Sequence, residues 1–258
     1  MAEFLLEEQR GHVRRITLNR PDKLNAMPPK MVDAFYAAVE AAAADSGTRV
    51  VVIAGAGRAF SSGADLKATG TSSASTRDAA GDMVASRARV DRWMRLWATP
   101  KPLIAQVQGY CLGIANELVG ACDLVVCGES ARFGMPEVRE FALPPTLGFW
   151  PMRIGLARTK ELLFTGRFLD GAEAVALGMA NTVVPDTELA ATVDELADKI
   201  AQVPTALLAV TKQAANAWAE TWGVRESTLR GADYHALYHT ASSWAERFGT
   251  PAAGTPAT

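Results

Sequence analysis

The sequence predicts an α/β fold, with a core of strands and helices followed by a helical C-terminal third. Two observations predict it. In the first part of the chain, short β-branched apolar runs, typical of strands buried on both faces, alternate with helical periodicity. Beyond residue 149 the pattern is helical apart from residues 181–184. Such alternation followed by helices alone indicates an α/β core with a helical appendage.

The core elements are predicted in chain order. Residues 3–8 and 12–18 are expected to form two strands joined around Gly11, which is the pattern of a hairpin. Consecutive prolines at Pro28 and Pro29 open a helix that runs to about residue 45, because proline suits a first helical turn. Buried strands are predicted at residues 50–54, 102–107 and 123–127, with an amphipathic helix ending at residue 97 and a short helix beginning near Gly113.

Long helices are predicted at residues 186–202, 205–221 and 226–246. The last ten residues consist of Gly, Pro, Ala and Thr and are expected to be frayed. No sequence repeat or low-complexity linker divides the chain. We therefore predict a catalytic core over residues 1–195 and a helical region over residues 196–258.

Composition and charge limit the function classes. With 258 residues, 49% hydrophobic, the chain can bury a large core, and its net charge of −2 gives no indication of a nucleic-acid or anionic-membrane partner. The sequence lacks an apolar run of membrane-spanning length, and its N-terminus lacks the pattern of a signal peptide, so we expect a cytoplasmic protein. The three cysteines, Cys111, Cys122 and Cys127, are interpreted as buried hydrophobic residues.

Two glycine-containing turns follow predicted strands, at residues 55–66 (GAGRAFSSGADL) and 109–117 (GYCLGIANE). Amides at the start of a helix have no intrahelical acceptor and lie at the positive end of its dipole, so they can bind the oxyanion of a thioester carbonyl. The spacings of dinucleotide and P-loop motifs are absent from the first turn. For either turn, a purely structural role remains the alternative.

Two glutamates are candidates for chemistry. Glu117 lies in an otherwise apolar helix, where burial of a charge is costly, so it is either functional or a first-turn residue that interacts with the helix dipole. Glu137 ends an apolar extended stretch, and by itself it fits an ordinary surface residue.

Other polar residues give weaker indications. The pair Ser61 and Ser62 has no evident histidine base, which argues against a serine hydrolase. His235 and His239 have a spacing that can bind a metal, but without a third ligand we interpret them as solvated histidines on a helix and predict no metal site.

Further motifs occur in a fixed order at residues 19–27 (NRPDKLNAM), 59–66, 109–118, 122–124, 133–137 (FGMPE), 163–166 (LFTG) and 174–180 (AVALGMA). Over roughly residues 3–220 they resemble the crotonase, or enoyl-CoA hydratase/isomerase, superfamily. The resemblance implies a crotonase-like spiral of ββα units. It also implies that residues 196–258 form a trimerisation region, giving a homotrimer or a dimer of trimers.

The resemblance also implies site residues. The amides of Ala64 and Ile114 would form an oxyanion hole, and typical hydratases carry two glutamates at the positions of Glu117 and Glu137. Many isomerases keep only the second, and dienoyl isomerases add an aspartate where this chain has Pro145. The substrate's CoA is expected to lie along Lys23, Leu24, Ala26, Ala64, Asp65, Leu66 and Lys67.

The sequence thus predicts an enoyl-CoA hydratase that adds water across the 2,3 double bond of a 2-enoyl-CoA, with no cofactor because CoA belongs to the substrate. Glu137 would donate a proton to C2 and Glu117 would activate the water. The alternatives are another reaction of the superfamily, namely double-bond isomerisation, thioester hydrolysis or ring chemistry, or a non-catalytic acyl-CoA-binding protein.

Two departures from the family pattern leave the acyl group open. Ile114 stands where glycine is usual, and a β-branched residue does not readily adopt positive φ, so we expect a reshaped oxyanion hole. Pro145 has no N–H to offer a water molecule. Phe141, Phe149 and Trp150 are interpreted either as an acyl-pocket wall or, preferably, as core residues.

Overall fold

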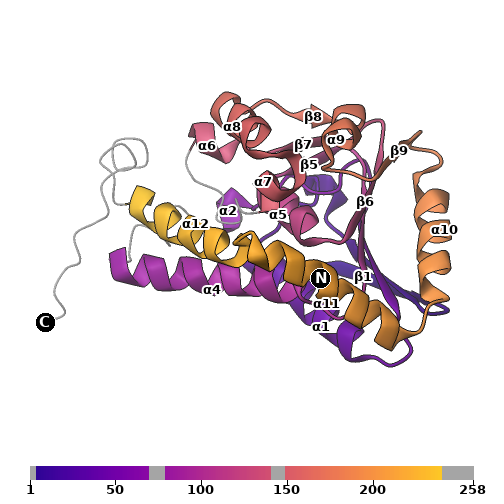
Figure 1. The fold of residues 1–258 in the computed structure, drawn as a ribbon. Helices are drawn as coiled ribbons and strands as arrows, with labels where there is room; N and C mark the ends of the chain where they lie inside the picture. Colours follow the sequence, from indigo (N-terminus) through magenta and orange to yellow (C-terminus); the bar gives the residue numbers. More distant parts are fainter. Residues whose placement is uncertain (1–3, 70–78, 141–148, 240–258) are drawn as a thin grey trace, which may run out of the picture.

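The computed structural model describes residues 4–69, 79–140 and 149–239, which form two sheets flanked by helices (Figure 1). The larger sheet has the strand order β1-β2-β3-β4-β6-β9. Its first two strands form an antiparallel hairpin, and every other neighbouring pair is parallel. The strands are β1 (Leu5–Arg10), β2 (Val13–Leu18), β3 (Val50–Gly55), β4 (Leu103–Val107), β6 (Leu124–Gly128) and β9 (Thr182–Val184). The α/β prediction is confirmed.

A second sheet contains three very short strands, β5 (Tyr110–Leu112), β7 (Arg132–Gly134) and β8 (Leu169–Asp170), in the order β5-β7-β8. Strands β5 and β7 are parallel, whereas β7 and β8 are antiparallel. These strands were not predicted, because two or three residues are too few to show an alternating pattern. Their position is important, since β5 leads directly into the helix that carries Glu117.

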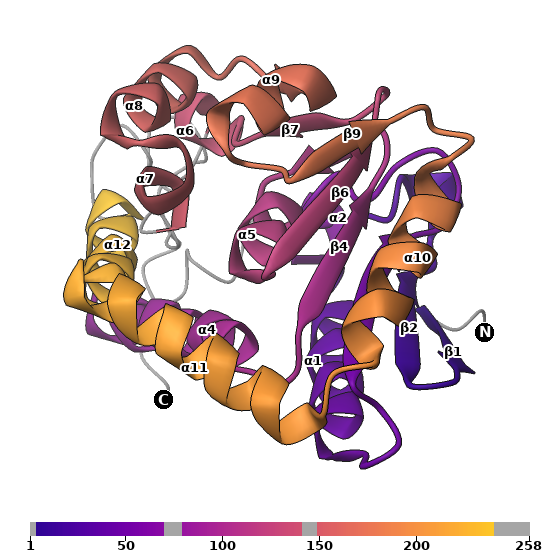
Figure 2. The same ribbon diagram turned by 45° about the vertical axis from the view of Figure 1, so that its right-hand side comes forward.

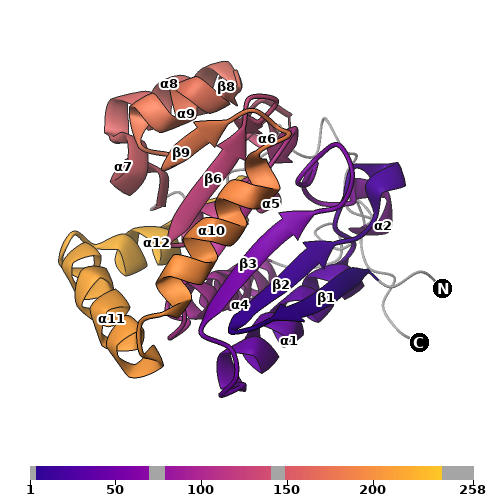
Figure 3. The same ribbon diagram turned by 90° about the vertical axis from the view of Figure 1, so that its right-hand side faces the viewer.

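Helices cover both faces of the larger sheet. They are η1 (Pro21–Lys23), α1 (Pro29–Ala44), α2 (Leu66–Thr69), α4 (Ala79–Trp97), α5 (Ile114–Ala121), α6 (Glu137–Glu140), α7 (Phe149–Ile154), α8 (Leu156–Thr165), α9 (Gly171–Leu177), α10 (Leu189–Ala201), α11 (Thr205–Thr221) and α12 (Val224–His239). Helix α10 lies across one face of the larger sheet, and α5 lies on the opposite side (Figures 2 and 3).

Strand β3 shows why its sequence is apolar without alternation. Val50 and Val52 belong to the cluster that packs on α10. Val51 and Ile53 point to the opposite face and belong to the main core, which includes residues of α1, α4 and α5. A strand covered on both faces needs apolar side chains at every position, so the prediction of a doubly buried strand is confirmed.

The C-terminal helices pack on the rest of the chain. Helix α12 lies alongside α4 (Figure 1), and Arg87 of α4 donates two hydrogen bonds to Asp233 of α12, at 2.7 and 2.9 Å. Helix α10 spans the predicted boundary between residues 195 and 196. The role of residues 196–258 in subunit assembly stays a prediction, and residues 240–258, including the end expected to be frayed, lie outside the described ranges.

A buried ion pair joins α11 to the core, and breaking it is expected to destabilise the fold. Lys212 donates to Asp123 at 2.7 Å, with side chains only 6% and 22% exposed, and Asp123 also accepts the amide of Leu103. Lys212→Met leaves this carboxylate without its cation, so the free energy of unfolding should fall by on the order of 3 kcal/mol in urea denaturation. An equal loss in Lys199→Met, at an exposed lysine of α10, would contradict a specific role for the pair.

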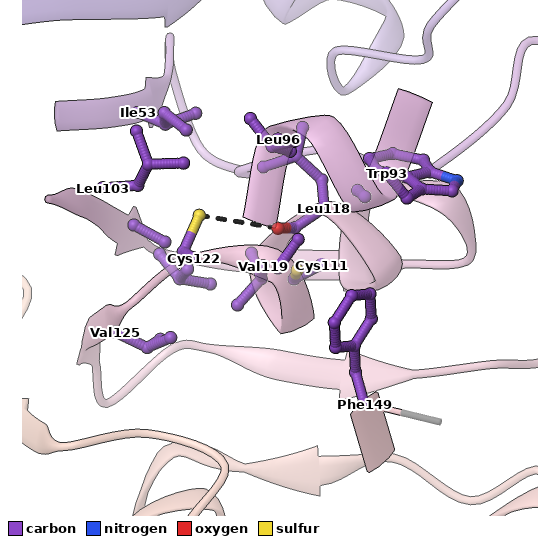
Figure 4. Packing of buried hydrophobic residues seen from close by; sticks show 14 of the residues in the cluster. Ile53, Trp93, Leu96, Leu103, Cys111, Leu118, Val119, Cys122, Val125 and Phe149 are labelled. Atoms are coloured by element: carbon purple, nitrogen blue, oxygen red, sulfur yellow. Dashed lines mark hydrogen bonds between the residues drawn. The ribbon is translucent and has the colours of Figure 1, made fainter. Parts of the chain in front are cut away.

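The three cysteines are free thiols and buried, as predicted. Cys111 and Cys122 lie in the core beside α5, where Cys122 Sγ is 3.5 Å from the carbonyl oxygen of Leu118 (Figure 4). Burial raises the pKa of Cys122 and of Cys127 to about 12. Thiols with such pKa values stay protonated near neutral pH and are unsuited to nucleophilic catalysis.

One prediction about the histidines is wrong. His235 is not solvated: its side chain is only 5% exposed, because it lies on the packed face of α12. The side chain of His239 lies outside the described part of the chain. Over residues 4–69, 79–140 and 149–239, no three His, Cys, Asp or Glu side chains are grouped to hold a metal ion, and no helix is long and apolar enough to cross a membrane.

Candidate active site

The segment that contains Ala64 is held between two other segments. Ser61 forms an isolated parallel bridge with Cys111 of β5. On the other side, the Met27 amide donates to the Gly63 carbonyl at 2.8 Å, and the Asp65 amide donates to the Met27 carbonyl at 3.0 Å. These two bonds form an isolated parallel bridge between Met27 and Ala64, and they use the groups of Gly63 and Asp65 without using the amide of Ala64.

Helix α5 begins at a glycine with positive φ. Gly113 has φ +56°, and its carbonyl accepts the amides of Asn116 and Glu117 at 2.9 and 3.0 Å, which starts the helix. Ile114 is the first helical residue, and it does not have positive φ. The unusual backbone conformation therefore falls on the residue before Ile114, so this residue type places no backbone strain on the turn.

The two turns approach each other closely. A Cβ atom added to Gly63 would lie 2.7 Å from the Leu112 carbonyl oxygen and 3.7 Å from the Gly113 Cα. Ala64 and Ile114 directly follow these glycines, and their amides donate no hydrogen bond to an acceptor in the described residues. Two such amides can stabilise a developing oxyanion, each by about 3–4 kcal/mol. Their use for this purpose stays a prediction.

Both candidate glutamates lie close to Gly113, the residue before α5. Glu137 is the first residue of α6, and its Oε1 lies so near Gly113 that a Cβ there would be 1.8 Å from it. Glu117 follows one helical turn after Gly113 and is only 2% exposed. The structure thus brings the two glutamates to the turns that carry Ala64 and Ile114, although they are twenty residues apart in the sequence.

Tyr36 of α1 lies near the same place, and the sequence analysis missed it. Burial raises the pKa of its phenol well above the ordinary value; the charge of Arg92 lowers this pKa and that of Glu117 raises it. The carboxylate of Glu117 therefore lies close enough to act on the Tyr36 hydroxyl through its charge. Only the packing of α1 against the core, which no local motif encodes, brings these residues together.

The predicted CoA-binding residues lie along one edge of the site. Arg20 joins their two segments, because its Nη1 donates to the Ala26 carbonyl at 2.6 Å and to Asp65 Oδ2 at 2.9 Å. The hydrogen bond from Arg20 holds the pKa of Asp65 below its usual value. The carbonyl of Leu24 accepts the amide of Ser62 at 2.8 Å.

The lysines of this edge are open to solvent. Lys23 ends η1, while Leu66 and Lys67 begin α2, and all three side chains are exposed. Two exposed ammonium groups beside the Ala64 turn suit the phosphates of CoA. Binding of CoA at this edge stays a prediction.

Asn25 supports the Ala64 turn, a role that was not predicted from its motif. Its side chain is fully buried, and its Nδ2 lies within hydrogen-bonding distance of the carbonyls of Ala56, Ala59 and Phe60, at 2.9, 2.9 and 3.1 Å. Its own carbonyl accepts the Ser61 hydroxyl at 2.7 Å. Asn25 therefore positions the chain that leads to Ala64.

Asn25→Asp is expected to disrupt this support. The substituted side chain keeps its size but would direct a carboxylate at three carbonyl oxygens, so both the free energy of unfolding and kcat/KM for an enoyl-CoA should fall, the former by about 3 kcal/mol or more. Asn216→Asp is the matched control, because among the described residues the Asn216 side chain donates one bond, to the Trp97 carbonyl at 3.2 Å. Unchanged turnover in Asn25→Asp would argue against the positioning role.

A comparison with protein families identifies the chain. The family model of enoyl-CoA hydratase/isomerase matches residues 8–249, which is nearly the whole sequence. This chain belongs to that family. A probable mitochondrial enoyl-CoA hydratase of Dictyostelium discoideum is 35% identical to it over 81% of this chain and 74% of the relative. The 2,3-dehydroadipyl-CoA hydratase of Escherichia coli is 34% identical over 83% and 82%.

Solved structures of the enoyl-CoA hydratase/isomerase family share its fold. A probable enoyl-CoA hydratase from Mycobacterium smegmatis superposes with a TM-score of 0.87 and 31% identity, covering 96% of this chain and 98% of that chain. An enoyl-CoA hydratase/isomerase from Xanthobacter autotrophicus Py2 gives 0.86 and 34%, covering 97% and 95%. The crotonase-like fold expected from the sequence motifs is confirmed.

Two predictions about the site environment have different outcomes. Phe149 and Trp150 are almost fully buried in the main core, and Phe149 lies 6.2 Å from Trp97 between ring centroids. The preference for core packing is therefore confirmed for these two residues. Phe141 and Pro145 lie outside the described residues, and the predictions about them stay predictions.

Proposed function

We propose that this family member is an enoyl-CoA hydratase that adds water across the 2,3 double bond of a 2-enoyl-CoA. The observation that carries the proposal is that Glu137 Oε1 lies against Gly113, one helical turn before the buried Glu117 and beside the paired turns of Ala64 and Ile114. An isomerase or a thioester hydrolase does not require two carboxyl groups at this place. Relatives named as hydratases support the same reaction.

The mechanism follows from what each group can do. Glu117, ionised, takes a proton from water while the water oxygen bonds to C3. The π electrons of the double bond move toward the thioester, whose oxygen becomes negative and is bound by the amides of Ala64 and Ile114. Glu137, protonated, delivers its proton to C2. Glu117 is then protonated and Glu137 ionised, and proton transfer between them through water restores the starting state.

No cofactor is required by this proposal, because the two carboxyl groups make both proton transfers and CoA enters with the substrate. The exposed edge formed by Lys23 and Lys67 would bind the CoA phosphates, as the family resemblance implies. We further propose that the protein acts as a homotrimer or a dimer of trimers through residues 196–258.

A panel of CoA thioesters tests the reaction. Purified protein is incubated with straight-chain, branched and cyclic 2-enoyl-CoA thioesters, and loss of the conjugated enoyl-thioester absorbance is followed together with the mass of the product. Hydration predicts a product heavier by one water and retaining CoA. Products of unchanged mass indicate isomerisation, release of free CoA indicates hydrolysis, and binding without turnover indicates a non-catalytic protein; each of these results would overturn the proposal.

A further inference from the structure

Helices α1 and α4 hold three buried hydrogen-bond donors beside the candidate active site. The Tyr36 hydroxyl, Arg89 Nε and Trp93 Nε1 are buried and have no hydrogen-bond partner among the described residues. The side chains of Tyr36 and Trp93 are only 7% and 2% exposed. Buried phenol and indole groups normally find a partner, because an unpaired buried donor destabilises the fold. Three such donors together indicate a site for an acceptor.

The three donors form one cluster. The rings of Tyr36 and Trp93 meet edge to face with centroids 5.7 Å apart, and the guanidinium of Arg92 lies 4.2 Å above the Tyr36 ring. Arg89 precedes Arg92 by three residues and Trp93 by four, so these side chains are neighbours on one face of α4. That face is directed toward Tyr36 of α1.

Two arginines of α4 on either side of Arg89 have carboxylate partners. Arg87 forms an ion pair with Asp233, and Arg92 with Asp33 at 2.8 Å. Arg89 has no ion pair with a described carboxylate, and its Nη2 reaches only the Ser86 hydroxyl, at 3.4 Å. A half-buried guanidinium without a counterion is costly, and an anion that arrives with a ligand would remove this cost.

The cluster lies beside α5, the helix that carries Glu117. Trp93 packs in the same core cluster as Leu118, which follows Glu117 on α5 (Figure 4). The Tyr36 ring contacts Trp93 and Arg92 of α4, and the charges of Glu117 and Arg89 both act on the pKa of its hydroxyl. A group bound by this cluster would thus be part of a molecule that reaches Glu117.

We propose that the acyl group of the substrate ends in a carboxylate, bound by Arg89, the Tyr36 hydroxyl and the Trp93 indole N–H. This inference rests on the proposed function and names its substrate class: the CoA thioester of an unsaturated dicarboxylic acid. A neutral hydroxyl or ketone would satisfy the phenol and the indole, but it would leave the charge of Arg89 without a counterion. Only an acid accounts for all three donors.

Matched substrates test the proposal. For short- and medium-chain 2-enoyl-CoA thioesters, kcat/KM is measured with and without a terminal carboxylate. At one chain length, the unsubstituted protein should have a kcat/KM at least about tenfold higher for the thioester with the terminal carboxylate than for the thioester without it. Hydrogen bonds to charged groups contribute that much. Arg89→Gln should abolish the preference and Tyr36→Phe should reduce it. Arg95→Gln, at an exposed arginine of the same helix, is the control and should retain it.

The experiment distinguishes failure of the carboxylate proposal from failure of the proposed hydration. If the enzyme hydrates both classes equally, or if Arg89→Gln keeps the preference, the carboxylate proposal is overturned while hydration stands, and the donors then bind only ordered water. The saturated thioesters, with and without the carboxylate, are also measured by calorimetry. Tighter binding of the acid that is lost in Arg89→Gln supports the proposal even where no hydration is found, and equal binding overturns it.

Discussion

Glu117→Gln and Glu137→Gln are each expected to lower kcat for hydration by about 10²–10⁴-fold, with little change in the free energy of unfolding. Glutamine keeps the shape of glutamate but can neither accept the proton of water nor deliver one to C2. In the proposed mechanism the two side chains act on different atoms of one substrate, so neither should compensate for the loss of the other. Steady-state absorbance assays with the best enoyl-CoA of the panel measure the effect.

Two further variants sharpen this prediction. Glu40→Gln, at an exposed glutamate of α1, is the control and should keep normal turnover. The double variant Glu117→Gln/Glu137→Gln should be little slower than the slower single variant, because groups that act in one concerted step are not additive. Near-normal turnover in either single variant would contradict the two-carboxylate mechanism.

Gly113→Ala is expected to reduce hydration by about 100-fold or more and also to destabilise the protein. At φ +56° any Cβ is strained, and here it would also lie 1.8 Å from Glu137 Oε1, so the carboxylate must move away from the reacting carbons. A displacement of about 1 Å at a catalytic group is enough to cost this factor. Turnover and urea denaturation are both measured.

Gly11→Ala separates the two effects. Gly11 has the same φ of +56°, but a Cβ there would meet nothing within 4 Å. This variant should lose stability by about 1 kcal/mol and retain its turnover, because only the backbone strain is shared with Gly113→Ala. Similar turnover in the two variants would show that the position of Glu137 is not critical.

The sequence predicted well those parts of the fold that depend on local pattern. The apolar run of β3 and the two prolines at the start of α1 are local patterns that predict these elements. Both elements lie where they were expected. Strands β5 and β7 have no such signal, because each contains three residues and is defined by pairing with neighbouring strands. Helices and strands could be predicted where a pattern extended over several residues. They could not be predicted where the strand depends on its pairing partner.

The candidate site shows the same division. Glu117 and Glu137 stood out because they lie in apolar surroundings within recognisable motifs. The sequence could not show whether Gly113 or Ile114 takes the positive φ, because the residue at which α5 begins depends on contacts of β5. Tyr36 and Arg89 were missed because they are far apart in the sequence and meet only when α1 packs against α4.

Under the carboxylate proposal, the contact between α4 and α12 would give α12 an influence on substrate choice. Helix α4 carries Arg89 and Trp93 on one side and is held by Asp233 of α12 on another. A substitution on α12 that shifts α4 by a fraction of an ångström would move the arginine relative to the acyl chain without touching any catalytic group. Selection for a new acyl group could therefore act on residues that never meet the substrate, and libraries aimed at altered specificity should include the buried face of α12.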